Sequence, residues 1–157
     1  MRSVHCSVVV HRPPEEVYAF ASEPDHLGRW AAGLASAEVT REGDTLLVAG
    51  SMGQVRVVFV EPNAFGVLDH EVTTPDGTTT YNPLRVVAHP EGSEVVFSVR
   101  QLALTDDELE RDAALVQADL ERLRDLLEGQ ALPLSSPPPS RGAPTGWSAA
   151  AGTGAAR

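Results

Sequence analysis

Apolar residues recur at helical spacing near the end of the patterned part of the chain. Six of them step by 4, 3, 4, 3 and 4 positions and so share one helical face: Leu109, Ala113, Val116, Leu120, Leu123 and Leu127. Thr105 and Glu108 form a T-x-x-E capping box at the start, and Gly129 supplies the stop. We interpret the other face as solvent-facing because it carries charged residues: Glu110, Asp112, Asp119, Glu121, Arg122 and Asp125.

The residues before this helix alternate between apolar and polar positions, with a break after the first strand. Residues 3–11 are rich in Val and predict a strand, and two short helices are expected from Pro14 and from Pro24. Six strand-like segments then follow, separated by hairpin turns: 35–42, 45–51, 54–61, 65–73, 79–89 and 93–102. The order predicts an α+β helix-grip fold, in which a curved seven-stranded antiparallel sheet wraps round the long C-terminal helix.

The hairpin turns predict which side chains face this helix, because turn length sets the register of the strands. We take Asp76-Gly77 as a two-residue turn and Pro90-Glu91-Gly92 as a three-residue loop. The inner face then holds Val55, Val57, Phe59, Leu68, His70, Val72, Tyr81, Arg85, Val87, Val95, Phe97 and Val99. The outer face holds Arg56, Asp69, Glu71, Thr80, Asn82, Ser98 and Arg100.

An apolar wall with a few polar groups is typical of a small-molecule pocket. His70, Tyr81 and Arg85 are the candidate catalytic residues, and the alternative is a filled core with Tyr81 and Arg85 at its rim. An inward arginine without an acid partner would favour a ligand oxygen or water beside it. The candidate ligand-binding residues are Trp30, Val55, Val57, Phe59, Leu68, His70, Tyr81, Arg85, Phe97, Val99, Val116 and Leu120. We expect Trp30 near the cavity entrance; the alternative is that it only fills the core.

Composition narrows the classes of partner. The chain has 157 residues and a net charge of −10, and all of its basic residues are arginine. This charge opposes binding to nucleic acid or to anionic lipid. No stretch is long and apolar enough for a membrane span, and the single Cys6 fits a reducing cytoplasm. Residues 1–130 are expected to form one domain, and the Pro-, Gly-, Ser- and Ala-rich residues 131–157 a disordered tail.

The sequence lacks the motifs of several well-defined chemistries. The chain has no HExxH or CxxC metal motif, no GxSxG nucleophile elbow and no Gly-rich phosphate loop. We therefore expect neither a metal nor a cofactor.

The stretch from Arg12 to Trp30, RPPEEVYAFASEPDHLGRW, resembles the "P-x-E-V-F/Y … P … W" opening of the SRPBCC superfamily of START-like proteins. The segment from Asp119 to Glu128, DLERLRDLLE, resembles the C-terminal helix of that superfamily. The resemblance covers residues 3–129 and implies a cavity between helix and sheet for an apolar or aromatic molecule. In the cyclase members, Arg, Tyr and His side chains orient a poly-β-ketone and assist its closure.

Three functions stay open at this point. The first is a binder of a small hydrophobic or aromatic metabolite, and the second is a polyketide cyclase or dehydratase using acid–base residues in the same cavity. The third is a module that regulates a partner protein through its helix or tail. In each case we expect a monomer or a homodimer.

Overall fold

A computed structural model describes residues 1–32, 38–50 and 53–129 of the chain. The predicted tail, residues 131–157, lies outside the described residues. The elements follow in the order β1 (Ser3–Val10), α1 (Pro14–Ser22), α2 (Pro24–Trp30), β2 (Glu38–Glu42), β3 (Thr45–Gly50), β4 (Gly53–Phe59), β5 (His70–Thr73), β6 (Thr79–Asn82), β7 (Leu84–His89), β8 (Gly92–Arg100) and α3 (Asp106–Leu127).

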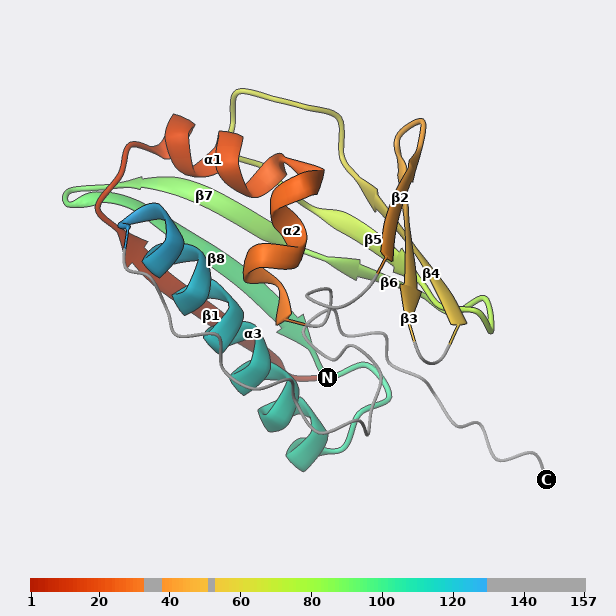
Figure 1. Cartoon of the computed structure of the whole chain (residues 1–157). Helices are drawn as coiled ribbons and strands as arrows, with labels where there is room; N and C mark the ends of the chain where they lie inside the picture. Colours follow the sequence, from red (N-terminus) through yellow and green to blue (C-terminus); the bar gives the residue numbers. More distant parts are fainter. Residues whose placement is uncertain (33–37, 51–52, 130–157) are drawn as a thin grey trace.

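Helix α3 forms as the apolar spacing predicts, and it lies across β1 and β8 (Figure 1). The capping box is present: the Glu108 backbone N–H donates to Thr105 Oγ1 at 3.3 Å, and the Thr105 backbone N–H donates to Glu108 Oε2 at 2.8 Å. The apolar stripe is buried from Leu109 to Leu123, and Leu127 is half-buried at its end. Burial of this stripe, rather than helix propensity, supplies most of the stability of such a helix.

The interpretation of the opposite face as solvent-facing is wrong for Asp112, Asp119 and Asp125, which are buried. The end of α2 packs against α3, and the Ala32 backbone N–H donates to Asp119 Oδ1 at 2.9 Å. Asp125 accepts a hydrogen bond from Arg124 Nε at 2.9 Å. Asp119 therefore has a partner that is distant in sequence and Asp125 has one that is adjacent, and a helical repeat alone does not reveal either.

The strands form two antiparallel sheets instead of the single seven-stranded sheet that we predicted. One has the order β1-β8-β7 and the other β2-β3-β4-β5-β6. The predicted strand at residues 79–89 is interrupted at Pro83, which has no backbone N–H to donate, and so becomes β6 and β7. An isolated bridge pairs Val67, in the segment before β5, with Arg85 of β7.

Asp69 lies at the break and is only 1% exposed. Its Oδ1 accepts the backbone N–H of Leu84 at 2.9 Å, the first donor after the proline. The hydroxyl of Tyr81 donates to Oδ2, and the Arg85 guanidinium pairs with the carboxylate. One buried side chain therefore contacts the chain on both sides of Pro83, and we call this arrangement the Asp69 seam.

The predicted strand at 65–73 begins only at His70, because the preceding residues form a loop around Asn63. Asn63 Oδ1 accepts the backbone N–H groups of Phe65 and Val67 at 3.0 and 3.1 Å. Gly66 has φ +71°, and a Cβ there would lie 2.0 Å from the carbonyl oxygen of Val86. Only glycine fits this close approach, which allows the Val86 backbone N–H to donate to Gly66 O at 2.8 Å.

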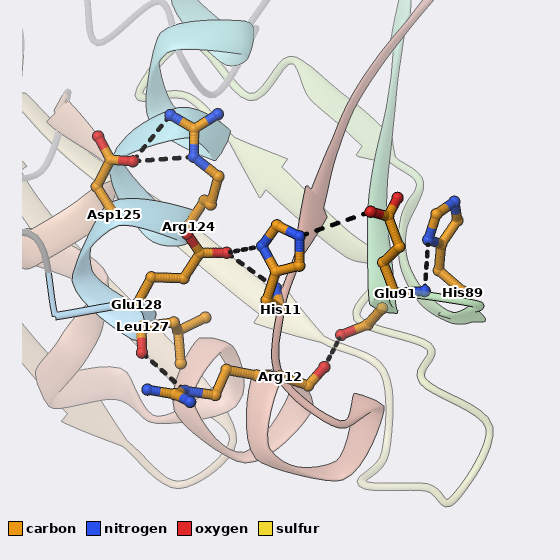
Figure 2. Close-up of polar contacts among 9 residues, drawn as sticks. His11, Arg12, His89, Glu91, Arg124, Asp125, Leu127 and Glu128 are labelled. Atoms are coloured by element: carbon orange, nitrogen blue, oxygen red, sulfur yellow. Dashed lines mark hydrogen bonds and ion pairs between the residues drawn. The ribbon is translucent and has the colours of Figure 1, made fainter.

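Polar contacts join the end of β1 to the end of α3 (Figure 2). Glu128 Oε1 accepts the backbone N–H of His11 at 2.8 Å and lies 2.9 Å from His11 Nδ1. These contacts, the backbone one foremost, lower the pKa of Glu128. Arg12 Nε donates to Leu127 O at 3.0 Å, and Ser93 Oγ donates to Arg12 O at 2.7 Å. The helix is thereby fixed to the sheet at its C-terminal end as well as along its apolar face.

Leu120→Asp should lower the free energy of unfolding by about 3–5 kcal/mol, because it places an unpaired charge in the core at a side chain that is fully buried. Leu115→Asp on the same helix is the matched control: Leu115 is 43% exposed, and its replacement should change stability by less than about 0.5 kcal/mol. Denaturant titration of both variants makes the comparison. Equal losses in the two would contradict the packing described for α3.

Asp69→Ala should cost about 2–4 kcal/mol, because the buried Leu84 N–H loses its acceptor and the partly exposed Arg85 loses its counter-charge. Asp69→Asn, which keeps an acceptor oxygen, should cost less. Glu71→Ala, an exposed acid two residues along the chain, should change stability by less than about 0.5 kcal/mol. A wild-type unfolding curve for Asp69→Ala would show that the seam does not hold the sheets together.

Candidate functional site

Most residues of the predicted inner face are buried in the core. Cross-strand partners share a face, and the register pairs Phe59 with His70 and Val57 with Val72. On β8 the inward positions Val95, Phe97 and Val99 are all buried, and so are Val55, Leu68, Val116 and Leu120. These candidate ligand-binding residues form the apolar core between the helices and the sheet.

Both predicted registers of the strand at residues 79–89 are wrong by one residue. Thr79 pairs with Thr73, and the Thr74 backbone N–H donates to Thr78 O at 2.9 Å, so three residues rather than two make the turn. His89 pairs directly with Gly92, so two residues rather than three make the next loop. Both differences shift the strand in the same direction, and a shift of one residue turns every side chain to the opposite face.

Tyr81, Arg85 and Val87 consequently lie on the outer face, contrary to the prediction. Tyr81 and Val87 are each 41% exposed, and Arg85 pairs with Asp69 in the seam. Arg85 therefore has an acid partner and does not require a ligand oxygen, contrary to our expectation. The candidate trio His70, Tyr81 and Arg85 does not gather in one pocket.

Thr80 and Asn82 lie at inward positions of this strand, where we had expected Tyr81 and Arg85. Thr80 is 4% exposed and Asn82 is 3% exposed, and Asn82 is the cross-strand partner of His70. With His70 they form what we call the inner polar cluster. Sequence reasoning missed both residues, although the large aliphatic side chains of Leu84 and Val86 share their parity and favour it for the inward face.

His70 is 1% exposed, and its ring lies between two aromatic neighbours. The ring centroid is 5.0 Å from that of Phe59 and 5.9 Å from that of Phe97. Its Nδ1 lies 3.1 Å from Leu68 O. A carbonyl oxygen only accepts, so Nδ1 carries the proton and Nε2 is the basic nitrogen. Burial lowers the pKa of His70 to about 4, so the ring is neutral at pH 7.

Two polar atoms of the cluster have no hydrogen-bond partner among the described residues. They are Thr80 Oγ1 and Asn82 Nδ2, both inaccessible to solvent. A buried polar group without a partner costs free energy, and such groups in a native protein call for water, a ligand or strain as an explanation. The cluster is therefore the part of the core in which water or a polar group of a ligand would gain hydrogen bonds.

A cleft of about 280 Å³ opens near the cluster, at the junction of α1 and α2. Its lining is Tyr18, Ser22, Glu23, Pro24, Arg41, Asp44, Leu46, Phe59, Val60, Glu61, Pro62 and Leu68. Phe59 lines the cleft and its ring also contacts that of His70, so this side chain is shared by the cleft and the inner polar cluster.

Trp30 does not line the cleft. It ends α2, is 3% exposed, and belongs to the core. Its carbonyl oxygen accepts a hydrogen bond from Arg122 at 3.2 Å, which links α2 to α3. The structure therefore places Trp30 as the alternative reading had it, filling the core rather than at the entrance of this cleft.

The described residues contain no group of three or more His, Cys, Asp or Glu side chains that could hold a metal ion. Cys6 is buried, and its Sγ donates to Ala113 O at 3.3 Å. Burial raises the pKa of this thiol, so it packs as a small apolar side chain and is a poor nucleophile.

The family model described as "polyketide cyclase / dehydrase and lipid transport" matches residues 1–128, and the chain belongs to this family. The predicted membership of the SRPBCC superfamily is thereby confirmed. Comparison with curated proteins found no match. Among the helices of the described residues, none is long and apolar enough to cross a membrane.

Solved structures share the fold at low sequence identity. The Aha1 dimer from Colwellia psychrerythraea is 14% identical with a TM-score of 0.68, over 84% of this chain and 100% of that one. An uncharacterized protein from Bacillus thuringiensis is 16% identical with a TM-score of 0.64, over 81% and 99%. DynU16, a protein in the dynemicin biosynthetic locus, is 15% identical with a TM-score of 0.63, over 80% and 47%. At these identities the likeness establishes the fold alone.

The buried His70 should make the protein less stable in acid. Its pKa falls on folding from 6.5 to about 4, so the folded state binds its proton more weakly than the unfolded state does. Its contribution is fully present above pH 6.5 and is lost as the pH falls toward 4. Between pH 7.5 and 4 the free energy of unfolding of the wild type should fall relative to that of His70→Gln by about 3 kcal/mol. A pH-independent difference between the two proteins would contradict the burial of a neutral His70.

Proposed function

We propose that the chain binds a small hydrophobic or aromatic molecule between α3 and the sheet, with the polar end of that molecule at the inner polar cluster. The observation that carries the proposal is the pair of buried atoms without a hydrogen-bond partner among the described residues, Thr80 Oγ1 and Asn82 Nδ2. A ligand oxygen between them would remove the cost of leaving them unpaired.

The surroundings of the cluster suit an apolar ligand body. Phe59 and Phe97 flank His70, and Val95 and Val99 of β8 and the apolar stripe of α3 are buried in the same core. Apolar walls with a few placed polar groups give a small-molecule site its affinity and its orientation. The cleft beside α1 and α2 provides the approach, and displacement of the Phe59 ring would join it to the cluster.

A polyketide cyclase or dehydratase is the second candidate, and His70 favours it. Its Nε2 carries no proton at pH 7, as a general base requires, although a pKa of about 4 makes it a weak base. The family description includes cyclases and dehydrases, and the structural relative DynU16 belongs to a biosynthetic locus. Tyr81 and Arg85 have no place in this mechanism, because they lie on the outer face.

We place the protein in the cytoplasm as a monomer or a homodimer. The single cysteine supports a reducing compartment, and the structural relative from Colwellia psychrerythraea is a dimer. Regulation of a partner protein is the third candidate function, since no contact among the described residues favours it over ligand binding.

Native mass spectrometry of the purified protein should reveal a co-purified molecule of small mass. If the molecule enters from the cleft past Phe59, Phe59→Ala should speed its association several-fold, because the ring in contact with both the cleft and the cluster is gone. Phe65→Ala is the matched control, because Phe65 is 84% exposed and does not line the cleft.

Stopped-flow binding of the recovered molecule, or of 2-acetylnaphthalene as a probe, measures these rates. Equal rates in Phe59→Ala and wild type would show that the approach does not pass Phe59. Absence of saturable binding by any apolar probe would remove the proposed function itself.

A further inference from the structure

We infer that the inner polar cluster selects an uncharged hydrogen-bond acceptor, such as a ketone or amide carbonyl, and excludes the corresponding carboxylate. The inference rests on the proposed function and deepens it, because it names the chemical class of the ligand's buried end. It departs from the expectation of an anion-binding Arg85, which the structure places on the outer face.

The buried charges of the described residues are all carboxylates. The buried ionisable side chains are those of Asp69, Asp112, Asp119, Asp125, His70 and the thiol of Cys6, and no arginine is buried in this part of the chain. The sequence contains no lysine. A carboxylate transferred from water to this interior would meet no cation to offset its lost hydration, which makes its burial costly.

The arginine nearest in sequence to the cluster is already engaged. Arg85 is held by Asp69 on the outer face of the strand, while Thr80 and Asn82 face inward. Turning Arg85 inward would require the strand to shift by one residue, which would also break the hydrogen bond from Leu84 to Asp69. The guanidinium of Arg85 is therefore not available to a ligand in the core.

The unpartnered atoms define what the ligand must offer. Asn82 Nδ2 can only donate, and Thr80 Oγ1 can donate or accept. Two donors two residues apart on the inward face of β6 suit a carbonyl oxygen, which has two lone pairs and carries no charge. An apolar ligand without oxygen would leave both donors unsatisfied, so the carbonyl adds affinity as well as orientation.

The rim of the cleft adds a second selection against anions. It carries the carboxylates of Glu23, Asp44 and Glu61 against the single guanidinium of Arg41. The whole chain has a net charge of −10, so its field also disfavours the approach of an anion. Entry through the cleft and binding at the cluster therefore both disfavour an anion.

Three probes of similar shape test the inference by calorimetry at pH 7.5: 2-acetylnaphthalene, 2-naphthoate and naphthalene. The ketone should bind at least about 10-fold more tightly than the carboxylate, as expected when an unpaired charge must be buried. Thr80→Val and Asn82→Leu should each weaken binding of the ketone by about 3- to 10-fold, the range of one neutral hydrogen bond. Neither variant should change the binding of naphthalene.

Thr79→Val is the matched control, because Thr79 is exposed and faces outward beside Thr80. It should leave the binding of all three probes unchanged. Thr80→Val and Asn82→Leu should fold as well as the wild type, since each replaces an unsatisfied polar group by an apolar one. If either variant fails to fold, the comparison of ketone with carboxylate on the wild type still decides the selectivity.

Each other outcome overturns the inference in a distinguishable way. Binding of 2-naphthoate as tight as that of the ketone overturns charge exclusion and leaves the proposed function standing. Equal binding of naphthalene and the ketone, insensitive to both variants, overturns the role of the cluster but not the proposal that the protein binds an apolar molecule. Absence of saturable binding by all three probes overturns the inference together with the proposed function.

Discussion

The arrangement of this protein depends on how one buried carboxylate compensates for one proline. Pro83 interrupts a strand and leaves the next backbone donor, on Leu84, without its place in a sheet ladder. Asp69 accepts that donor and also holds Tyr81 and Arg85. These contacts fix which side of the strand faces the helices.

The inward side chains follow from this constraint. With Tyr81 and Arg85 held outside, Thr80 and Asn82 face the core beside His70. The interior then contains neutral donors and a neutral imidazole where a cation had been expected. An apolar site with neutral polar groups orients a ligand without attracting or neutralising an anion.

The sequence predicted the helices and the antiparallel α+β class well, because those signals are local, but it did not predict the division of the strands into two sheets. The 3,4-spacing and capping box of α3 and the prolines that begin α1 and α2 need only neighbouring residues, and all are present. The register of the strand at 79–89 was not predictable in this way. Each of the two flanking turns differs by one residue from the length that its Gly, Pro and Asp residues suggest. A small error of this kind exchanged Tyr81 and Arg85 for Thr80 and Asn82. The burial of Asp69 could not be predicted from the sequence either, because its partners are distant in sequence.

The most direct test of this account is a nuclear Overhauser measurement on the protein bound to 2-acetylnaphthalene. The inward placement of Asn82 predicts contacts between the ligand's acetyl methyl group and the side-chain amide protons of Asn82, and none to the ring of Tyr81. Contacts from the ligand to the Tyr81 ring, with none to Asn82, would contradict the register set by the Asp69 seam and the site derived from it.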